Sequence, residues 1–247
     1  MTSSEQARRR RLVPAFVLHT RPYRNTSLIL DVFTEAHGRA GIVARGARAG
    51  KRARSGLLQA FQPLLLSWSG RGELGTLTGV EAAGRALVPK GRRLYSGLYI
   101  NELVVRFLHR DDPHPELFAH YREALRALAG DEDEEVAIRR FEVQLLQEMG
   151  YGLIVDHEAR SGEAIEADRR YAYQLEAGPV YLRDGDAGAD DVTVVSGATL
   201  LALRDGRLEG EQVRREARRL LRQLIAHHLG GRPVQSRLLF TAASYTE

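Results

Sequence analysis

The first third of the chain alternates short apolar runs with turn-forming segments. Between residues 14 and 82 the runs are PAFVLHTRPY, NTSLILDVFT, GRAGIVARGA, LQAFQPLLLSWS and ELGTLTGVEA. Aliphatic, β-branched and aromatic side chains fill these runs, and glycine, proline and asparagine lie between them. Five strands with no helix between them predict a small closed barrel of the OB type, although an SH3-like barrel has a similar pattern.

Beyond Pro89 the apolar spacing becomes helical. Residues 94–109 are apolar on nearly every side, which predicts a helix buried inside a bundle. Further helices are predicted over 115–129, 134–149, 196–203 and 210–229. The acidic segment DEDEE opens the third of these five helices, where negative charge suits the helix N-terminus, and Ser196 can cap the fourth.

These patterns predict an α+β multidomain protein. We expect an OB-fold domain over residues 1–84 and a helical domain formed by 85–150 together with 193–247. Residues 151–192 are rich in Gly, Asp and Tyr and form an irregular insert, in which YAYQLEAGPVYLRD is typical of a short hairpin.

The positive charge is concentrated at the N-terminal end. The formal net charge is +4, but residues 1–57 carry twelve lysines and arginines against three acids, so the remainder of the chain is net negative. The segment ARGARAGKRARSG (44–56) holds no acid and no large apolar side chain. This segregation favours an N-terminal domain that binds a polyanion, the alternative being a merely solvated surface loop.

Several chemistries are excluded or disfavoured by the sequence. The absence of cysteine excludes disulfides, thiolate-bound zinc and cysteine nucleophiles. GRGELG (70–75) matches the letters of a dinucleotide fingerprint, but a strand follows it where a helix is needed, so it is read as a hairpin turn. No catalytic constellation is present, and we expect a binding protein without cofactor or metal rather than an enzyme.

No apolar run approaches the roughly 18 residues of a membrane span, so a cytoplasmic protein is expected.

Six blocks of the chain, in order, resemble the RecO family of bacterial recombination and repair mediators. They are AFVLHTRPYRNTSLILDVFTEAHGR (15–39), VARGAR (43–48), LLQAFQPLLLSWSGRGELGTL (57–77), LYSGLYINELVVRFL (94–108), RRFEVQLLQEMGYG (139–152) and LGGRPVQSRLLF (229–240). Many relatives carry a four-cysteine zinc site just after the GYG turn. Glu158 and Ser161 stand at the matching positions here, so zinc is not expected.

The resemblance implies a protein that binds single- and double-stranded DNA and anneals complementary strands. It also implies contact with the acidic C-terminal tail of single-stranded DNA-binding protein, action with RecR, an indirect role in loading RecA, and association with the nucleoid. Two other hypotheses stay open: a passive OB-fold module that binds single-stranded nucleic acid without annealing it, and an enzyme that uses the glycine-rich turns for a nucleotide.

The candidate DNA-binding residues are the basic side chains of the barrel and its loops, since each phosphate neutralised releases counterions. They are Arg21, Arg24, Arg39, Arg45, Arg48, Lys51, Arg52 and Arg54, with the arginines at 8–11 as secondary contributors. Tyr23, in a turn, is the candidate base-stacking residue. Trp68 can stack as well, but core packing explains it equally well.

The candidate residues for the partner's acidic tail lie in the helical part. An apolar pocket rimmed by guanidinium groups can clamp a terminal carboxylate. Arg139 and Arg140, with Tyr121 and Leu125 as apolar neighbours, fit this requirement, although either arginine could instead pair with the DEDEE segment. A further arginine-rich face, within residues 214–222, is either solvated or in contact with a partner.

Overall fold

The computed structural model describes residues 12–49, 56–70, 73–183 and 192–238. The chain divides into two compact units. The N-terminal unit comprises Met1–Asp131 and Val234–Glu247, and the C-terminal unit comprises Glu132–Pro233. This division places the first two long helices with the barrel, whereas the sequence suggested a boundary near residue 84.

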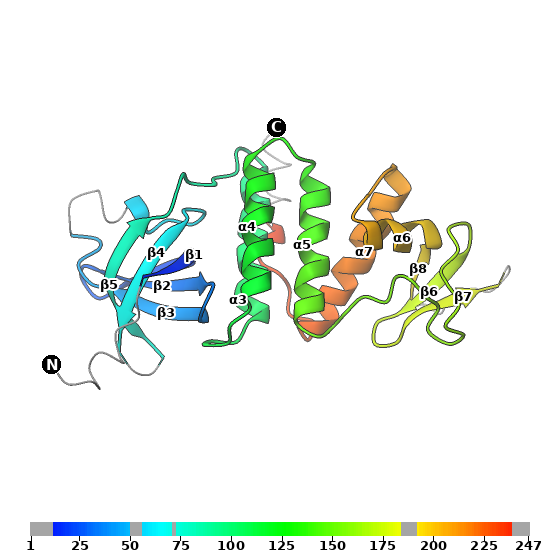
Figure 1. Cartoon of the computed structure of the whole chain (residues 1–247), viewed down its shortest axis with the longest axis horizontal. Coiled ribbons are helices and arrows are strands. Elements are labelled where there is room, and N and C mark those ends of the chain that lie inside the picture. The colour runs from blue at the N-terminus through cyan, green and yellow to red at the C-terminus, as the bar shows by residue number, and fades with distance from the viewer. Residues whose placement is uncertain (1–11, 50–55, 71–72, 184–191, 239–247) are drawn as a thin grey trace. The chain divides into compact units, whose positions relative to one another are not determined.

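The N-terminal unit contains a closed five-stranded barrel (Figure 1). The strands are β1 (Val13–Tyr23), β2 (Ser27–Thr34), β3 (Gly38–Ala44), β4 (Leu64–Ser69) and β5 (Gly75–Ala82). Their order is β1-β2-β3-β5-β4, and β1 closes the barrel by pairing with β4. All neighbours are antiparallel except β3 and β5, which are parallel. The predicted OB-type barrel is confirmed.

Strand β2 is apolar on both faces because each face meets a different core. Leu30 and Val32 point into the barrel core, and both are fully buried. On the outer wall, Phe33 packs edge-on against Phe118 of α4 (Pro115–Ala129), with ring centroids 5.2 Å apart. The outer wall of the barrel is therefore covered by helices at this point.

Helix α3 (Arg93–Phe107) is joined to the barrel and to α4 by buried polar contacts. Tyr121 of α4 donates its hydroxyl proton to Asn101 Oδ1 at 2.8 Å, and Asn101 Nδ2 donates to the Leu18 carbonyl at 3.1 Å. Burial raises the pKa of Tyr121, so the hydroxyl stays a donor. At its other side α3 holds the C-terminal segment, because Glu102 accepts the backbone amides of residues 235 and 236.

The C-terminal unit combines three helices with a small antiparallel sheet of order β7-β6-β8 (Figure 1). Its elements are α5 (Glu134–Glu148), β6 (Arg170–Gln174), β7 (Gly178–Leu182), β8 (Thr193–Ser196), α6 (Gly197–Asp205) and α7 (Glu211–His228). The predicted hairpin is formed by β6 and β7. Ser196 caps α6, as predicted, and Asp133 of the DEDEE segment caps α5 by accepting two backbone amides.

Two elements differ from the sequence prediction. Strand β8 was not predicted, because TVVS is too short to show a period of its own. The fourth strand begins at Leu64 rather than Leu58, because the chain turns at Phe61, whose φ is 66°. None of the helices in the four described ranges is long and apolar enough to cross a membrane.

Candidate nucleic-acid interface

Two turns meet at one end of the barrel and carry exposed arginines. The turn from β1 to β2 includes Arg24, and the turn that follows β3 includes Arg45 and Arg48. The strands bring these turns together because Leu28 of β2 lies opposite Ala44 of β3. The Arg48 amide then donates to the Thr26 carbonyl at 2.8 Å, which ties the turns to each other.

We name this surface the barrel-end cluster. It consists of Arg21, Tyr23, Arg24, Arg45 and Arg48. Its four arginines are exposed, and none forms an ion pair with any other residue that the structure describes. The Arg24 guanidinium lies 5.2 Å from the centroid of the half-buried Tyr23 ring, a cation–π contact. The cluster therefore combines uncompensated positive charge with an aromatic surface.

Arg39, a predicted DNA-binding residue, is not part of this cluster. It begins β3, at the opposite end of the strand, and forms a two-pronged ion pair with Asp31 at 2.8 and 2.9 Å. Its remaining nitrogen donates to the carbonyls of Val105 and Leu108 at the end of α3. With its side chain only 16% exposed, Arg39 connects α3 to the barrel, and its charge is compensated by Asp31.

Several predicted DNA-binding residues lie outside the described residues. They are Lys51, Arg52 and Arg54, together with the arginines at 8–11.

Trp68 is a core residue, 5% exposed within the barrel. A Cβ on Gly75 would come within 2.5 Å of its indole, so glycine is required there. The core explanation for Trp68 is confirmed, and the GRGELG segment connects antiparallel β4 and β5 as the hairpin interpretation requires.

The outer wall beyond Phe33 is closed by the connection between α3 and α4. The Asp111 amide donates to the Arg39 carbonyl at 2.9 Å, and Arg110 donates to the Glu73 carbonyl at 2.8 Å. Gly38 has φ 62° and approaches the Asp112 backbone so closely that any Cβ would overlap it. These contacts leave the barrel end, rather than the outer wall of β2 and β3, as the candidate nucleic-acid surface.

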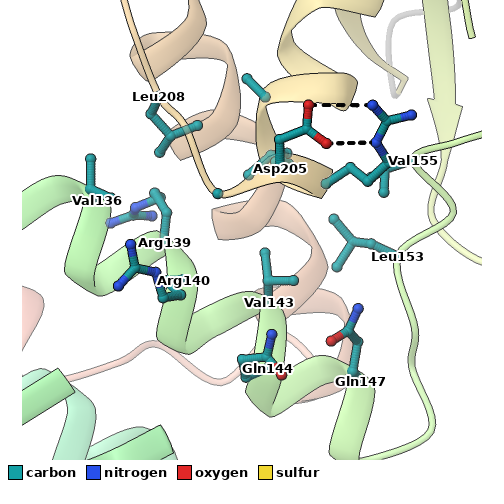
Figure 2. Close-up of a pocket in the computed structure, with 14 residues that line it drawn as sticks. Val136, Arg139, Arg140, Val143, Gln144, Gln147, Leu153, Val155, Asp205 and Leu208 are labelled. Carbon is teal, nitrogen blue, oxygen red and sulfur yellow. Dashed lines mark hydrogen bonds and ion pairs between the residues drawn. The ribbon is translucent and has the colours of Figure 1, made fainter. Parts of the chain in front are cut away.

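The C-terminal unit contains a pocket of about 280 Å³ between α5, the end of α6 and the segment after the GYG turn (Figure 2). Its apolar lining includes Val136, Val143, Leu153, Val155, Leu203 and Leu208. Arg139 and Arg140 of α5 lie along one side. Arg204 and Asp205 lie at another, joined by a pair of hydrogen bonds at 2.8 and 3.3 Å. The pocket thus offers apolar surface beside guanidinium groups.

Family models cover both parts of the sequence. The one described as "Recombination protein O N terminal" matches residues 11–85, and the one described as "Recombination protein O C terminal" matches residues 89–238. The chain belongs to the RecO family.

Several curated relatives match over more than 90% of their length. "DNA repair protein RecO" of Methylococcus capsulatus is 50% identical over 93% of this chain and 93% of its own. The proteins of the same name from Nitrosococcus oceani and Azoarcus sp. strain BH72 are 48% and 47% identical, each over at least 90% of both chains. The identity suggested by six short blocks therefore extends along most of the sequence.

The structure separates the four residues proposed for the partner's tail. Tyr121 and Leu125 are completely buried in the N-terminal unit, where they pack α4, and they do not line the pocket described above. Arg139 and Arg140 do line the pocket of this RecO-family chain. Arg139 pairs at 2.6 Å with the fully buried Glu142, whereas Arg140 is about half exposed and lies 3.9 Å from Glu132 of the DEDEE segment.

The sequence did not identify the apolar lining of this pocket. Leu153 and Val155 belong to the short apolar run LIV that follows the GYG turn, which was treated as irregular. Leu208 lies alone between two helices. Such isolated apolar residues in loops were the available signal, but only the packing of α5 and α6 shows that they converge.

The insert is held at the position where many RecO relatives bind zinc. The Glu158 carboxylate is buried and accepts the backbone amides of Arg160, Ser161 and Tyr181. Burial alone would raise the pKa of Glu158, but these amides, with Ser161 first among them, lower it. Because the carboxylate is occupied by amides and Ser161 offers no thiolate, the residues present do not fit zinc.

Proposed function

We propose that this chain is a DNA repair and recombination mediator that binds single- and double-stranded DNA at the barrel-end cluster and anneals complementary strands. Membership of the RecO family supports the role in repair. The observation that carries the site is the meeting of the two turns, which brings Arg24, Arg45 and Arg48 together at the end of the barrel that also carries Arg21 of β1.

Binding at this surface is a matter of phosphate charge rather than of base sequence. Guanidinium groups without acidic partners neutralise phosphates and release condensed counterions, which gives affinity that falls steeply with salt. Tyr23, in the same turn region, supplies an aromatic ring on which a base of a single strand can stack. Lys51, Arg52 and Arg54 follow Arg48 in the chain and add charge to the same segment.

Annealing requires no covalent step. Two complementary strands repel each other until their phosphates are partly neutralised, and base pairing then proceeds by itself. We therefore propose an accessory factor rather than an enzyme, with no cofactor. The surface needs only positive charge on a fixed scaffold, which the hydrogen bond between Arg48 and Thr26 provides.

The pocket of the C-terminal unit is the proposed site for the acidic C-terminal tail of single-stranded DNA-binding protein. Its apolar lining can receive an apolar terminal side chain, and the half-exposed Arg140 can bind the terminal carboxylate. Arg139 contributes less, because Glu142 already compensates its charge. Tyr121 and Leu125 have no part in this proposal.

Action with RecR, and through it a role in loading RecA, completes the proposal. It is supported by family membership and by the near full-length match to proteins named for DNA repair. We propose that the chain delivers strands coated by single-stranded DNA-binding protein to these partners.

The test compares three proteins in annealing of complementary oligonucleotides coated with single-stranded DNA-binding protein, across a salt series. They are the wild type, Arg21→Gln/Arg45→Gln/Arg48→Gln, and a control with the same charge loss, Arg126→Gln/Arg160→Gln/Arg170→Gln. The control residues are exposed, and none of them belongs to the barrel-end cluster: Arg126 is on α4, and Arg160 and Arg170 are in the C-terminal unit.

The barrel-end variant should anneal more slowly, and the slope of log affinity against log salt should fall by about 2, since each phosphate contact to a single strand contributes about 0.7. The control should match the wild type. An unchanged slope in the barrel-end variant would place the DNA site elsewhere. If the wild type binds DNA but leaves coated strands apart, the passive binding module is the correct function.

A further inference from the structure

Helix α7 (orange in Figure 1) carries arginines with two different kinds of surroundings. Arg214 pairs with Asp133 at 2.7 Å, and Arg218 forms two hydrogen bonds with Glu135 at 2.8 and 2.9 Å. Both acids lie at the start of α5, so these pairs join α7 to α5. Their charges are compensated within the protein.

Arg215, Arg219 and Arg222 are different, and we name them the α7 stripe. All three are exposed, and no carboxylate of the described ranges lies within ion-pairing distance of them. Arg219 donates to the carbonyl of Val194, which is neutral and leaves the charge uncompensated. The spacing of four and three residues places them on one helix face, over about 10.5 Å along the axis.

A purely solvated helix face is a poor explanation for this arrangement. Like charges four residues apart, as in Arg215 and Arg219, repel each other and destabilise a helix. One acid, Glu211, lies on this face four residues before Arg215. No acid lies on this face between Arg215 and Arg222. The exposed neighbours Gln212 and Gln223 are polar but uncharged.

The chemistry of the stripe favours a nucleic-acid strand over a protein partner. Protein interfaces depend on a desolvated core of apolar and aromatic side chains, and this face of α7 has none. A phosphate backbone needs only cations and gains affinity from released counterions. Unpaired guanidinium groups in a row provide that.

We propose that the α7 stripe binds the phosphate backbone of a second DNA strand, in addition to the strand held at the barrel-end cluster. The inference rests on the proposed annealing function, because a chain that holds both complementary strands brings them together. Two cationic surfaces, one in each compact unit, allow one chain to hold both strands.

The experiment counts strands per protein. Fluorescently labelled dT20, which cannot pair with itself, is titrated against the full chain under stoichiometric conditions, and the mass of the complex is measured by sedimentation. The proteins are the wild type, Arg215→Gln/Arg219→Gln/Arg222→Gln, the same three positions changed to Lys, and the control Arg126→Gln/Arg160→Gln/Arg170→Gln. Circular dichroism checks that each is folded.

We expect two strands per wild-type chain and one per glutamine stripe variant, with the affinity for the first strand within twofold of wild type. Annealing by that variant should slow at least tenfold. The lysine variant should restore both, because the contact depends on charge, and the control should behave as wild type.

The inference is overturned if the wild type binds a single strand, or if the glutamine stripe variant keeps both strands and the wild-type annealing rate. Failure of the proposed function has a different signature. In that case the barrel-end variant Arg21→Gln/Arg45→Gln/Arg48→Gln retains the first strand, whatever the stripe variant does.

Discussion

Arginine has opposite roles at the two ends of β3. Arg39, near the start of the strand, pairs with Asp31 and donates to a carbonyl at the end of α3. Its charge is therefore compensated within the protein. Arg45 and Arg48, just after the strand ends, face no acid within the described structure and are exposed. The difference lies in the neighbours, because the C-terminus of a helix attracts a cation and a loop at the barrel end offers nothing comparable. Charge on its own therefore does not identify a binding residue.

The largest effect that tests this comparison is expected from Arg39→Gln. Removing the guanidinium leaves Asp31, 17% exposed, with only Arg110 at 4.0 Å as a cationic neighbour, and should lower the free energy of unfolding by about 3 kcal/mol. Urea denaturation measures this change. Arg48→Gln is the matched control and should change stability by less than about 0.5 kcal/mol.

For DNA affinity we expect the opposite ranking of the two variants, with the larger loss in Arg48→Gln. The folded fraction of Arg39→Gln should bind a single-stranded oligonucleotide as the wild type does, whereas Arg48→Gln should bind it more weakly and with a lower salt slope. A variant of Arg39 that is fully stable but defective in DNA binding would reverse the assignment made here.

Glu216 extends the comparison to a carboxylate whose charge is compensated by hydrogen bonds within the protein. Burial would raise its pKa, but hydrogen bonds from the Ser196 amide, the Gln212 side chain and the hydroxyls of Thr199 and Ser196 lower it to about 2. A lowered pKa gives stability that is complete above the unfolded value near 4.3 and is lost as the pH falls toward 2.

Glu216→Gln should therefore lower the free energy of unfolding by about 2 kcal/mol at pH 7, since hydrogen bonds to a charged group are lost. The difference from wild type should shrink between pH 4.5 and pH 2, as the wild-type carboxylate becomes protonated. Thermal melting across this range measures it, with the exposed Glu209→Gln as control. If the stability difference between variant and wild type stayed constant down to pH 2, the carboxylate charge would not be what stabilises these contacts.

The smallest expected effect concerns the pocket of the C-terminal unit. Arg140→Gln should weaken binding of the C-terminal tail peptide of single-stranded DNA-binding protein about tenfold, or about 1.4 kcal/mol, because a charge-assisted hydrogen bond is lost. Stability should not change, as Arg140 is half exposed. Fluorescence anisotropy with the labelled peptide measures the affinity, and Arg160→Gln is the control. Equal binding by both variants would exclude Arg140 from the site.

The secondary structure was largely predictable because it depends on local periodicity. The helix over 115–129 has the predicted bounds, and the barrel strands follow the apolar runs. Strand β8 was missed because it is stabilised by pairing with β6 rather than by a pattern in its own four residues. Tyr121 was misassigned for a related reason: a helical stripe shows which residues share a face, but not whether that face is covered.

The sequence by itself predicted a small five-stranded barrel, the helices that follow it, the concentration of charge at the N-terminal end and the family. Only the tertiary structure decided which cations are free, because compensation comes from residues distant along the chain. Asp31 is eight residues from Arg39, but the α3 carbonyls that complete its contacts are more than sixty away. The acids that neutralise Arg214 and Arg218 are about eighty residues away. Composition records the number of charges, whereas folding determines which of them remain exposed and uncompensated.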